Sequence, residues 1–229
     1  MASLTSTYRD LLKMKSHIDT REKGALFEGI AYEVTKQVQA VYGGAIFCGI
    51  KFPYARKSNG DEYPGNLRFD NGRLIELTRK KGNGTTYDEI DILYVNQFAI
   101  IAVECKAYGS SGGILLEDTW WRYSGNSEKY PLAQTEKHCR HLYHNIYELI
   151  PNGDPSYIKP VCAFIDKNTV TDSRSSEVRK FVDIAILAKG EYSLKQVLQR
   201  LSKPNEYLLH VEALIKKLNS ISIGGSLHR

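Results

Sequence analysis

The stretch IDILYVNQFAIIAVECK, residues 90–106, decides how the rest of the sequence is interpreted. It contains two runs rich in Ile, Val and Ala, 90–95 and 99–106, which are typical of neighbouring β-strands joined by a short loop. The second run is apolar on both alternating faces until it reaches Glu104. This pattern predicts a central strand that is covered on both sides of its sheet.

Charged residues end this apolar strand. Alternation places Ala102, Glu104 and Lys106 on one face. Their relation to Asp91 on the preceding strand depends on the length of the connecting loop. A two-residue loop makes Asp91 and Glu104 diagonal neighbours, a four-residue loop over 96–99 places them directly opposite, and a three-residue loop separates them. Loops of even length therefore predict a pair of carboxylates on one face.

A carboxylate pair beside a lysine has a recognisable chemistry. Buried charge is costly unless it is paired or bound to a metal, and two carboxylates with room for water suit Mg²⁺. A lysine on the same face can hold an attacking water or balance negative charge that develops on phosphorus. The alternative is that Glu104 and Lys106 lie at a strand end in solvent.

The surrounding sequence predicts helices and strands in the order α, β, β, β, α, β, followed by a strand and two helices. This order indicates a mixed α/β sheet flanked by helices, in a single domain over 1–229 with its core at about 20–190. Residues 191–229 are expected to form a C-terminal helical extension. The expected helices are 8–18, 20–41, 131–149, 193–201 and 204–218, and the expected strands beyond 90–106 are 45–52, 161–166 and 181–187, with a hairpin around Asp70-Asn71-Gly72.

The composition is that of a folded protein. The chain has 229 residues, and its hydrophobic content of 42% is typical of a globular protein and not of a disordered one. Its formal net charge of +5 is compatible with an anionic partner but does not require one. It has no apolar run of about 18 residues and no signal-peptide pattern at its start, so no membrane span is expected. Its four scattered cysteines predict free thiols in the cytoplasm, and Cys139 among helical histidines matches no closed zinc site.

Several blocks together resemble a known family. They are GALFE (24–28), DEIDIL (88–93), AVECKAYG (102–109), Trp120-Trp121, PLAQ (131–134) and VCAFI (161–165). In this order they resemble the NERD (nuclease-related) domain of the PD-(D/E)XK nuclease superfamily, over roughly residues 24–190. One departure is Ile90, which precedes Asp91 where the motif that names the superfamily has proline.

The resemblance implies a restriction-endonuclease-like fold with an αβββαβ core and metal-dependent hydrolysis of phosphodiester bonds. It implies that Asp91 and Glu104 bind Mg²⁺ or Mn²⁺ and that the main-chain carbonyl of Cys105 is a further ligand. Lys106 corresponds to the lysine that positions or activates the attacking water.

Two further residues take their roles from the same resemblance. Glu28 corresponds to an acid of the first helix that assists the metal site, although helical geometry alone favours a surface glutamate. Gln134 corresponds to a glutamine that opens the following helix and orients the active site or a phosphate. A glutamine in the first turn of a helix carries no such meaning by itself.

The resemblance therefore implies a nuclease in a microbial cytoplasm that acts on DNA in preference to RNA, a choice that the sequence itself leaves open. Endonuclease and exonuclease activity, strand preference and a homodimer all stay open. The alternative is a non-catalytic nucleic-acid-binding or regulatory module on the same fold. Segment 54–86 carries seven Lys/Arg against four acidic residues, and it either contacts nucleic acid or forms a solvated loop.

Overall fold

The fold is taken from a computed structural model of the chain. It describes residues 20–54, 66–70, 73–77, 87–106, 114–117, 121–122, 131–164, 170–179, 182–186 and 193–228. The helix expected at 8–18 lies outside these residues, as do Trp120 and parts of the segments 54–86 and 109–130.

Six strands form one mixed sheet in the order β10-β8-β5-β4-β1-β11. In that order their bounds are Asp183–Ile186, Ile158–Phe164, Ile100–Lys106, Tyr87–Val95, Ala45–Pro53 and Ser226–His228. Strand β4 pairs antiparallel with β1 and β5, and β11 pairs antiparallel with β1 at one edge. Strands β5, β8 and β10 run parallel. The strand that the sequence predicted to be central, β5, has a partner on each side.

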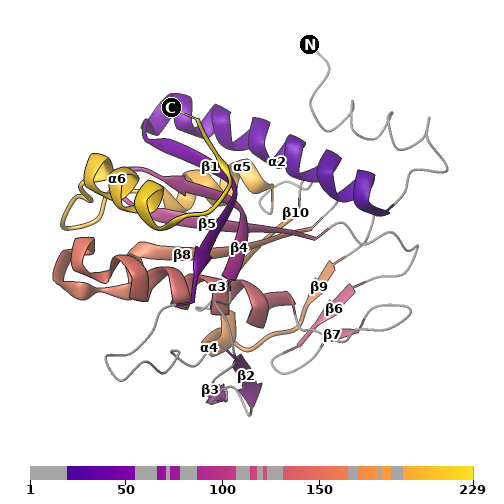
Figure 1. The fold of residues 1–229 in the computed structure, drawn as a ribbon. Helices are drawn as coiled ribbons and strands as arrows, with labels where there is room; N and C mark the ends of the chain where they lie inside the picture. Colours follow the sequence, from indigo (N-terminus) through magenta and orange to yellow (C-terminus); the bar gives the residue numbers. More distant parts are fainter. Residues whose placement is uncertain are drawn as a thin grey trace.

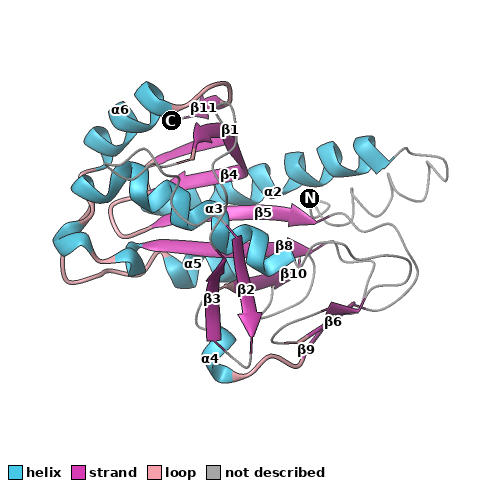
Figure 2. Cartoon of the chain, turned by 60° about the horizontal axis from the view of Figure 1, so that its bottom comes forward, coloured by secondary structure: helices cyan, strands magenta, loops and turns pink. Residues whose placement is uncertain are grey.

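Helices cover both faces of the sheet (Figures 1 and 2). Helices α2 (Thr20–Tyr42) and α5 (Leu194–Leu201) pack on one face, where Phe27 and Leu198 are fully buried. Helices α3 (Pro131–Ile146) and α6 (Val211–Ile221) pack on the other, where Leu142 and Leu214 are fully buried. Apolar burial on both faces explains why β5 has an almost continuous apolar sequence.

The elements α2, β1, β4, β5, α3 and β8 follow one another along the chain in the order predicted for the αβββαβ core. The predicted mixed α/β sheet flanked by helices is therefore confirmed, and it is consistent with a nuclease-like fold. Among the described residues, no helix has the length and apolar character that crossing a membrane would require.

Smaller elements lie outside the main sheet. Strands β2 (Asn66–Asp70) and β3 (Arg73–Leu77) form the expected hairpin, in which Asp70 pairs with Arg73. A second small sheet contains β6, β7 and β9, and a single helical turn, α4, follows it. Their bounds are Ile114–Leu116, Trp121–Arg122, Val170–Asp172 and Ser176–Arg179.

The C-terminal part differs from the prediction in two ways. The helix expected at 204–218 begins only at Val211, because the chain before it packs on the β4–β5 loop, where Leu209 N donates to Gln97 O at 2.8 Å. The part after residue 190 is also not only helical, because it ends in β11. Three residues that pair at the edge of a sheet carry too weak a pattern to be predicted as a strand.

A reversal of side-chain alternation occurs where β1 and β4 pair. Cys48 packs on the α2 side of the sheet, yet Ile50 packs on the α3 side. Ile92 and Ile90 on β4 change sides in the same way. On β1, between Cys48 and Ile50, Gly49 has a φ of 59°, a left-handed backbone conformation that favours glycine. The reversal turns the start of β4 so that Asp88 faces helix α3.

The β4–β5 loop sets the register of the two central strands. Val95 pairs with Ile100, so the loop is the four-residue alternative, 96–99. Buried Asn96 holds it: the Asn96 Oδ1 accepts from Phe98 N at 2.8 Å and Ala99 N at 3.0 Å, and the Asn96 Nδ2 donates to Ser202 Oγ at 2.9 Å.

We expect Asn96→Ala to lower the free energy of unfolding by about 2–4 kcal/mol, because it leaves buried donors without partners. Urea denaturation followed by circular dichroism measures this loss. The matched control is Asn205→Ala, which removes one exposed hydrogen bond from Asn205 Nδ2 to Phe98 O in the same loop. Equal losses in the two variants would contradict the role given to Asn96.

Candidate active site

The two carboxylates predicted as a pair lie where β4 and β5 stop pairing. The last paired residues there are Ile92 and Val103, and the same register places Asp91 across from Glu104. The Asp91 Oδ2 accepts a hydrogen bond from the main-chain N–H of Cys105 at 2.7 Å. The four-residue loop and this hydrogen bond together bring the side chain of Asp91 to the end of β5.

Glu104, Lys106 and Gln134 contact one another. The Lys106 Nζ lies 2.5 Å from Glu104 Oε1 and donates to Gln134 Oε1 at 3.2 Å. The Gln134 Nε2 donates to the same Glu104 Oε1 at 3.2 Å. Gln134 lies in the first turn of α3, so this helix supplies the third of the three contacting side chains, and β5 supplies the other two.

The two carboxylates differ in their protonation. Burial and the charge of Glu104 raise the pKa of Asp91 to about 7, although the Cys105 N–H opposes this shift. Burial also works against the charge of Glu104, but contacts with His138 and Lys106 lower its pKa below the ordinary value. The site therefore keeps Glu104 ionised, whereas nearby positive charge is too little to stabilise the ionised form of Asp91.

Lys106 keeps its proton. Burial works to lower its pKa, but the charge of Glu104 and the hydrogen bond to it outweigh this effect, so that the pKa lies above the ordinary value. An ammonium group can donate hydrogen bonds to a water or to a phosphate oxygen, but it cannot accept a proton. This protonation favours positioning of the water, or charge balance, over general-base catalysis.

Glu28 lies on α2 at the same end of the site. Its side chain reaches solvent, yet partial burial and the charges of Glu89 and Glu104 raise its pKa. Lys106 is close enough to oppose this shift. The helix therefore brings Glu28 within electrostatic range of the carboxylate pair.

Cys105 contributes to the site through its main chain. Burial and the charges of Asp91 and Glu104 raise the pKa of its thiol well above the ordinary value, so the thiol stays protonated and is a poor metal ligand. All four cysteines are free thiols.

The donor atoms at the site are of the type that a hard divalent cation prefers. They are carboxylate oxygens, and the raised pKa of Asp91 shows that a positive charge would be stabilising beside it. However, the described residues contain no group of three or more His, Cys, Asp or Glu side chains placed to hold a metal ion. A cation at Asp91 and Glu104 would therefore also need main-chain oxygen or water ligands.

The sequence interpretation missed a buried polar cluster beside Glu104. Asp88 is 3% exposed and contacts Lys137, His138 and His141 of α3. The spacing of Gln134, His138 and His141 along the helix places them on one face, which was the available signal. The second signal, Asp88 facing that helix, depends on the reversal at Gly49 and is not visible in the sequence.

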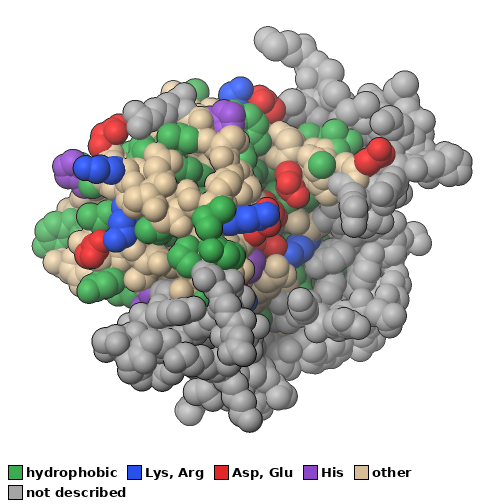
Figure 3. All heavy atoms as spheres, in the orientation of Figure 1, with side chains coloured by type: hydrophobic (Ala, Val, Ile, Leu, Met, Phe, Trp, Pro, Cys, Tyr) green, Lys and Arg blue, Asp and Glu red, His purple; other side chains and the backbone are tan. Residues whose placement is uncertain are grey.

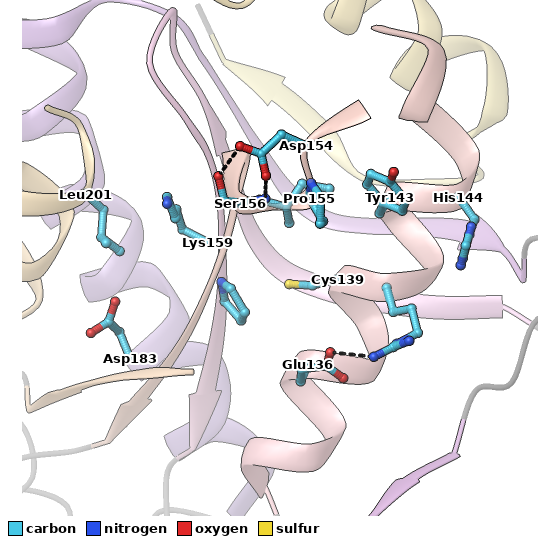
Figure 4. A pocket seen from close by; sticks show the side chains of 13 residues that line it. Glu136, Cys139, Tyr143, His144, Asp154, Pro155, Ser156, Lys159, Asp183 and Leu201 are labelled. Carbon is cyan, nitrogen blue, oxygen red and sulfur yellow. Dashed lines mark hydrogen bonds and ion pairs between the residues drawn. The ribbon is translucent and has the colours of Figure 1, made fainter. Parts of the chain in front are cut away.

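A separate cavity of about 550 Å³ lies along another face of α3. Figure 4 shows Glu136, Cys139, Tyr143 and His144 on the helix, with Lys159 and Asp183 across the hollow. None of the residues proposed for the active site lines it. At the carboxylates, by contrast, Glu28, Asp91, Glu104 and Lys106 shift one another's pKa values.

Comparison with known proteins identifies part of the chain. Residues 54–165 match the family model described as "Nuclease-related domain" (NERD). No curated protein sequence matches the chain. A solved structure described as "Crystal Structure of Protein of Unknown Function AF1548" has a TM-score of 0.32 and 11% sequence identity, covering 86% of this chain and 90% of that one. That likeness is too low to carry an argument.

Proposed function

We propose, from the premise that residues 54–165 belong to a nuclease-related (NERD) domain, that this protein is a metal-dependent nuclease that hydrolyses phosphodiester bonds in DNA. The observation that carries the proposal is the meeting of Asp91, Glu104 and Lys106 at the end of β5. One carboxylate is ionised, the other has a pKa of about 7, and a protonated lysine lies beside them. This combination suits the binding of a cation and an anionic substrate together.

Each residue has a distinct role in the proposal. Asp91 and Glu104 bind Mg²⁺ or Mn²⁺ together with the Cys105 carbonyl, and the bound cation supplies stabilisation of negative charge on the phosphate. Lys106 donates from its ammonium group to the attacking water or to a phosphate oxygen.

Two further residues support these groups. Gln134 holds Lys106 and Glu104 in register through its amide, which contacts both. Glu28 assists from α2, where its raised pKa marks it as a third carboxylate that would lie near the cation.

A non-catalytic nucleic-acid-binding module is the second candidate. The observation that favours it is the lack of a ready group of three metal-binding side chains among the described residues. Against it, Figure 3 shows acidic and basic side chains interspersed over the described part of one face, without the broad basic area that nucleic-acid binding favours. The basic residues of segment 54–86 belong to the part whose side chains are not described.

The proposal extends to the organisation of the chain. We propose one domain over residues 1–229, because β11 pairs with β1 and helices α5 and α6 pack on the two faces of the main sheet. The four free thiols support a cytoplasmic location, and a homodimer would suit an enzyme that cuts both strands of a duplex.

A cleavage assay tests the activity. We expect the purified protein to cut DNA with Mg²⁺ or Mn²⁺ and to lose all cutting in EDTA, because Asp91 and Glu104 need a cation to act on a phosphate. Circular and linear substrates, each single- and double-stranded, and a matched RNA would be resolved on denaturing gels. Cutting of circles identifies an endonuclease, and cutting of RNA alone would overturn the DNA assignment. Tight binding without cutting of any substrate would favour the binding module.

A further inference from the structure

His138 lies between two buried carboxylates. Its Nε2 is 3.4 Å from Asp88 Oδ1, and its Nδ1 is 3.5 Å from Glu104 Oε2. The side chains of His138, Asp88 and Glu104 are 9%, 2% and 7% exposed. The imidazole therefore connects the carboxylate of the proposed active site to a second carboxylate behind it.

The contact between His138 and Glu104 is electrostatic, because the buried His138 Nδ1 lies 3.5 Å from Glu104 Oε2 and makes no hydrogen bond with any described residue. The two side chains line a small hollow together with Ile90, Ala102 and Thr135, and this hollow has no room for a water molecule. Removal of the imidazole would leave the Glu104 Oε2 facing an apolar space. An ionised carboxylate in such a space is strongly destabilised, so it would be expected to rotate or to take up a proton.

Asp88 is itself fixed from several sides. Lys137 Nζ lies 3.1 Å from its Oδ1, and the His141 ring contacts its Oδ2. Burial works to raise the pKa of Asp88, but these neighbours and His138 lower it, so the carboxylate stays ionised. The Lys137 Nζ also donates to Tyr54 OH at 2.5 Å, which ties the cluster to the end of β1.

The two oxygens of Glu104 thus have different partners. Oε1 contacts Lys106 and Gln134, whereas Oε2 faces His138. We propose that His138, anchored by Asp88, is a positioning residue that fixes the orientation of Glu104 for metal binding. This inference rests on the proposed function, because it concerns the same carboxylate. His138 acts through Glu104, since both of its ring nitrogens face carboxylates inside the protein.

A double-mutant cycle tests the contact without metal or substrate. The single variants His138→Gln and Glu104→Gln and the double variant would be unfolded by urea in EDTA. We expect the double variant to lose less stability than the two single variants combined, because each single change removes the partner of the other residue. His138→Leu repeats the cycle with a side chain that cannot donate. Additive losses in both cycles would overturn the proposal.

Metal affinity tests the consequence of the contact. Calorimetric titration with Mn²⁺ should show a dissociation constant about tenfold higher for His138→Leu than for the unchanged protein, as expected when the partner of a metal ligand is lost. His138→Gln, which retains a donor, should recover most of the affinity. The matched control is His144→Leu, on the same helix but lining the separate cavity, and it should bind Mn²⁺ normally.

The outcomes separate the two proposals. If the unchanged protein binds Mn²⁺ and cuts DNA, but His138→Leu behaves like His144→Leu, the positioning role is wrong and the nuclease proposal stands. If the unchanged protein binds Mn²⁺ without cutting, the nuclease proposal fails, and the affinity of His138→Leu still decides the positioning role. If no Mn²⁺ binds, the metal-binding part of both proposals is wrong, and the urea cycle alone decides whether His138 holds Glu104.

Discussion

Replacement of Lys106 by methionine should lower kcat for DNA cleavage by about 10²–10³-fold, as is typical when one hydrogen-bond donor to a transition state is removed. The aliphatic part of the side chain is kept, but the ammonium group that contacts Glu104 and Gln134 is lost. Affinity for DNA should fall much less, because one buried lysine contributes little to contacts along the phosphate backbone. Single-turnover cleavage with saturating enzyme measures the first quantity, and fluorescence anisotropy in Ca²⁺ measures the second.

Loss of stability must be separated from loss of catalysis in this variant. The Lys106 and Glu104 side chains are 16% and 7% exposed, so removal of the cation leaves a nearly buried carboxylate without its main partner. The double change Lys106→Met with Glu104→Gln removes that unpaired charge. We expect it to recover part of the melting temperature, which would assign the lost stability of Lys106→Met to the unpaired Glu104. Cleavage is compared only between Lys106→Met and the unchanged protein, because Glu104 is itself a proposed metal ligand. Undiminished single-turnover cleavage by folded Lys106→Met would show that Lys106 has only a structural role.

The matched control is Lys217→Met. Lys217 also forms an ion pair, with Glu148 at 2.7 Å, but it lies on α6 and contacts none of the proposed site residues. Cleavage by this variant should equal that of the unchanged protein. A similar fall in both variants would mean that the assay reports general loss of charge and not the position of Lys106.

The sequence predicted the fold better than it predicted the site. Continuous apolar runs and amphipathic helices are local patterns, and they sufficed to predict the order of α2, β1, β4, β5, α3 and β8. Strand β11 and the late start of α6 depend on pairing with distant segments, β1 and the β4–β5 loop. Local patterns contain no information about such partners.

The carboxylate pair shows where sequence reasoning reached its limit. Alternation limited Asp91 and Glu104 to three arrangements, and only the four-residue loop held by Asn96 selects the one observed. Asp88 could not be assigned to the site in this way. Asp88 faces α3 because side-chain alternation reverses at Gly49. A glycine in the sequence permits a positive φ but does not require one, so this reversal could not be predicted.

Asp91→Asn should make the metal-free protein more stable at pH 8 while it abolishes cleavage. The pKa of Asp91 is raised from 3.8 to about 7, which corresponds to a destabilisation of up to about 4 kcal/mol when the group ionises. Asparagine keeps an oxygen that can accept from the Cys105 N–H, and it removes the repulsion with Glu104. The free energy of unfolding in EDTA, from urea denaturation at pH 8, measures the gain.

The sign of the pH dependence follows from the two states of the protein. Between about pH 4 and pH 7 the unfolded chain has lost the Asp91 proton and the folded protein retains it, so stability falls as pH rises through this interval. Above pH 7 both states are ionised and the contribution is constant. The advantage of Asp91→Asn should therefore be largest above pH 7 and should shrink as the pH approaches 4.

Metal should reverse the order of stability, which ties this effect to function. Mg²⁺ that binds the folded protein alone stabilises it by mass action, so the melting temperature of the unchanged protein should rise with Mg²⁺ concentration. Asp91→Asn lacks one charged ligand, so its melting temperature should rise much less. Asp183→Asn, which removes a partly exposed ion pair with Arg200, is the control and should keep both the pH profile and the response to Mg²⁺. If Asp91→Asn were less stable than the unchanged protein in EDTA at pH 8, Asp91 would be a structural residue and not one held ready for a cation.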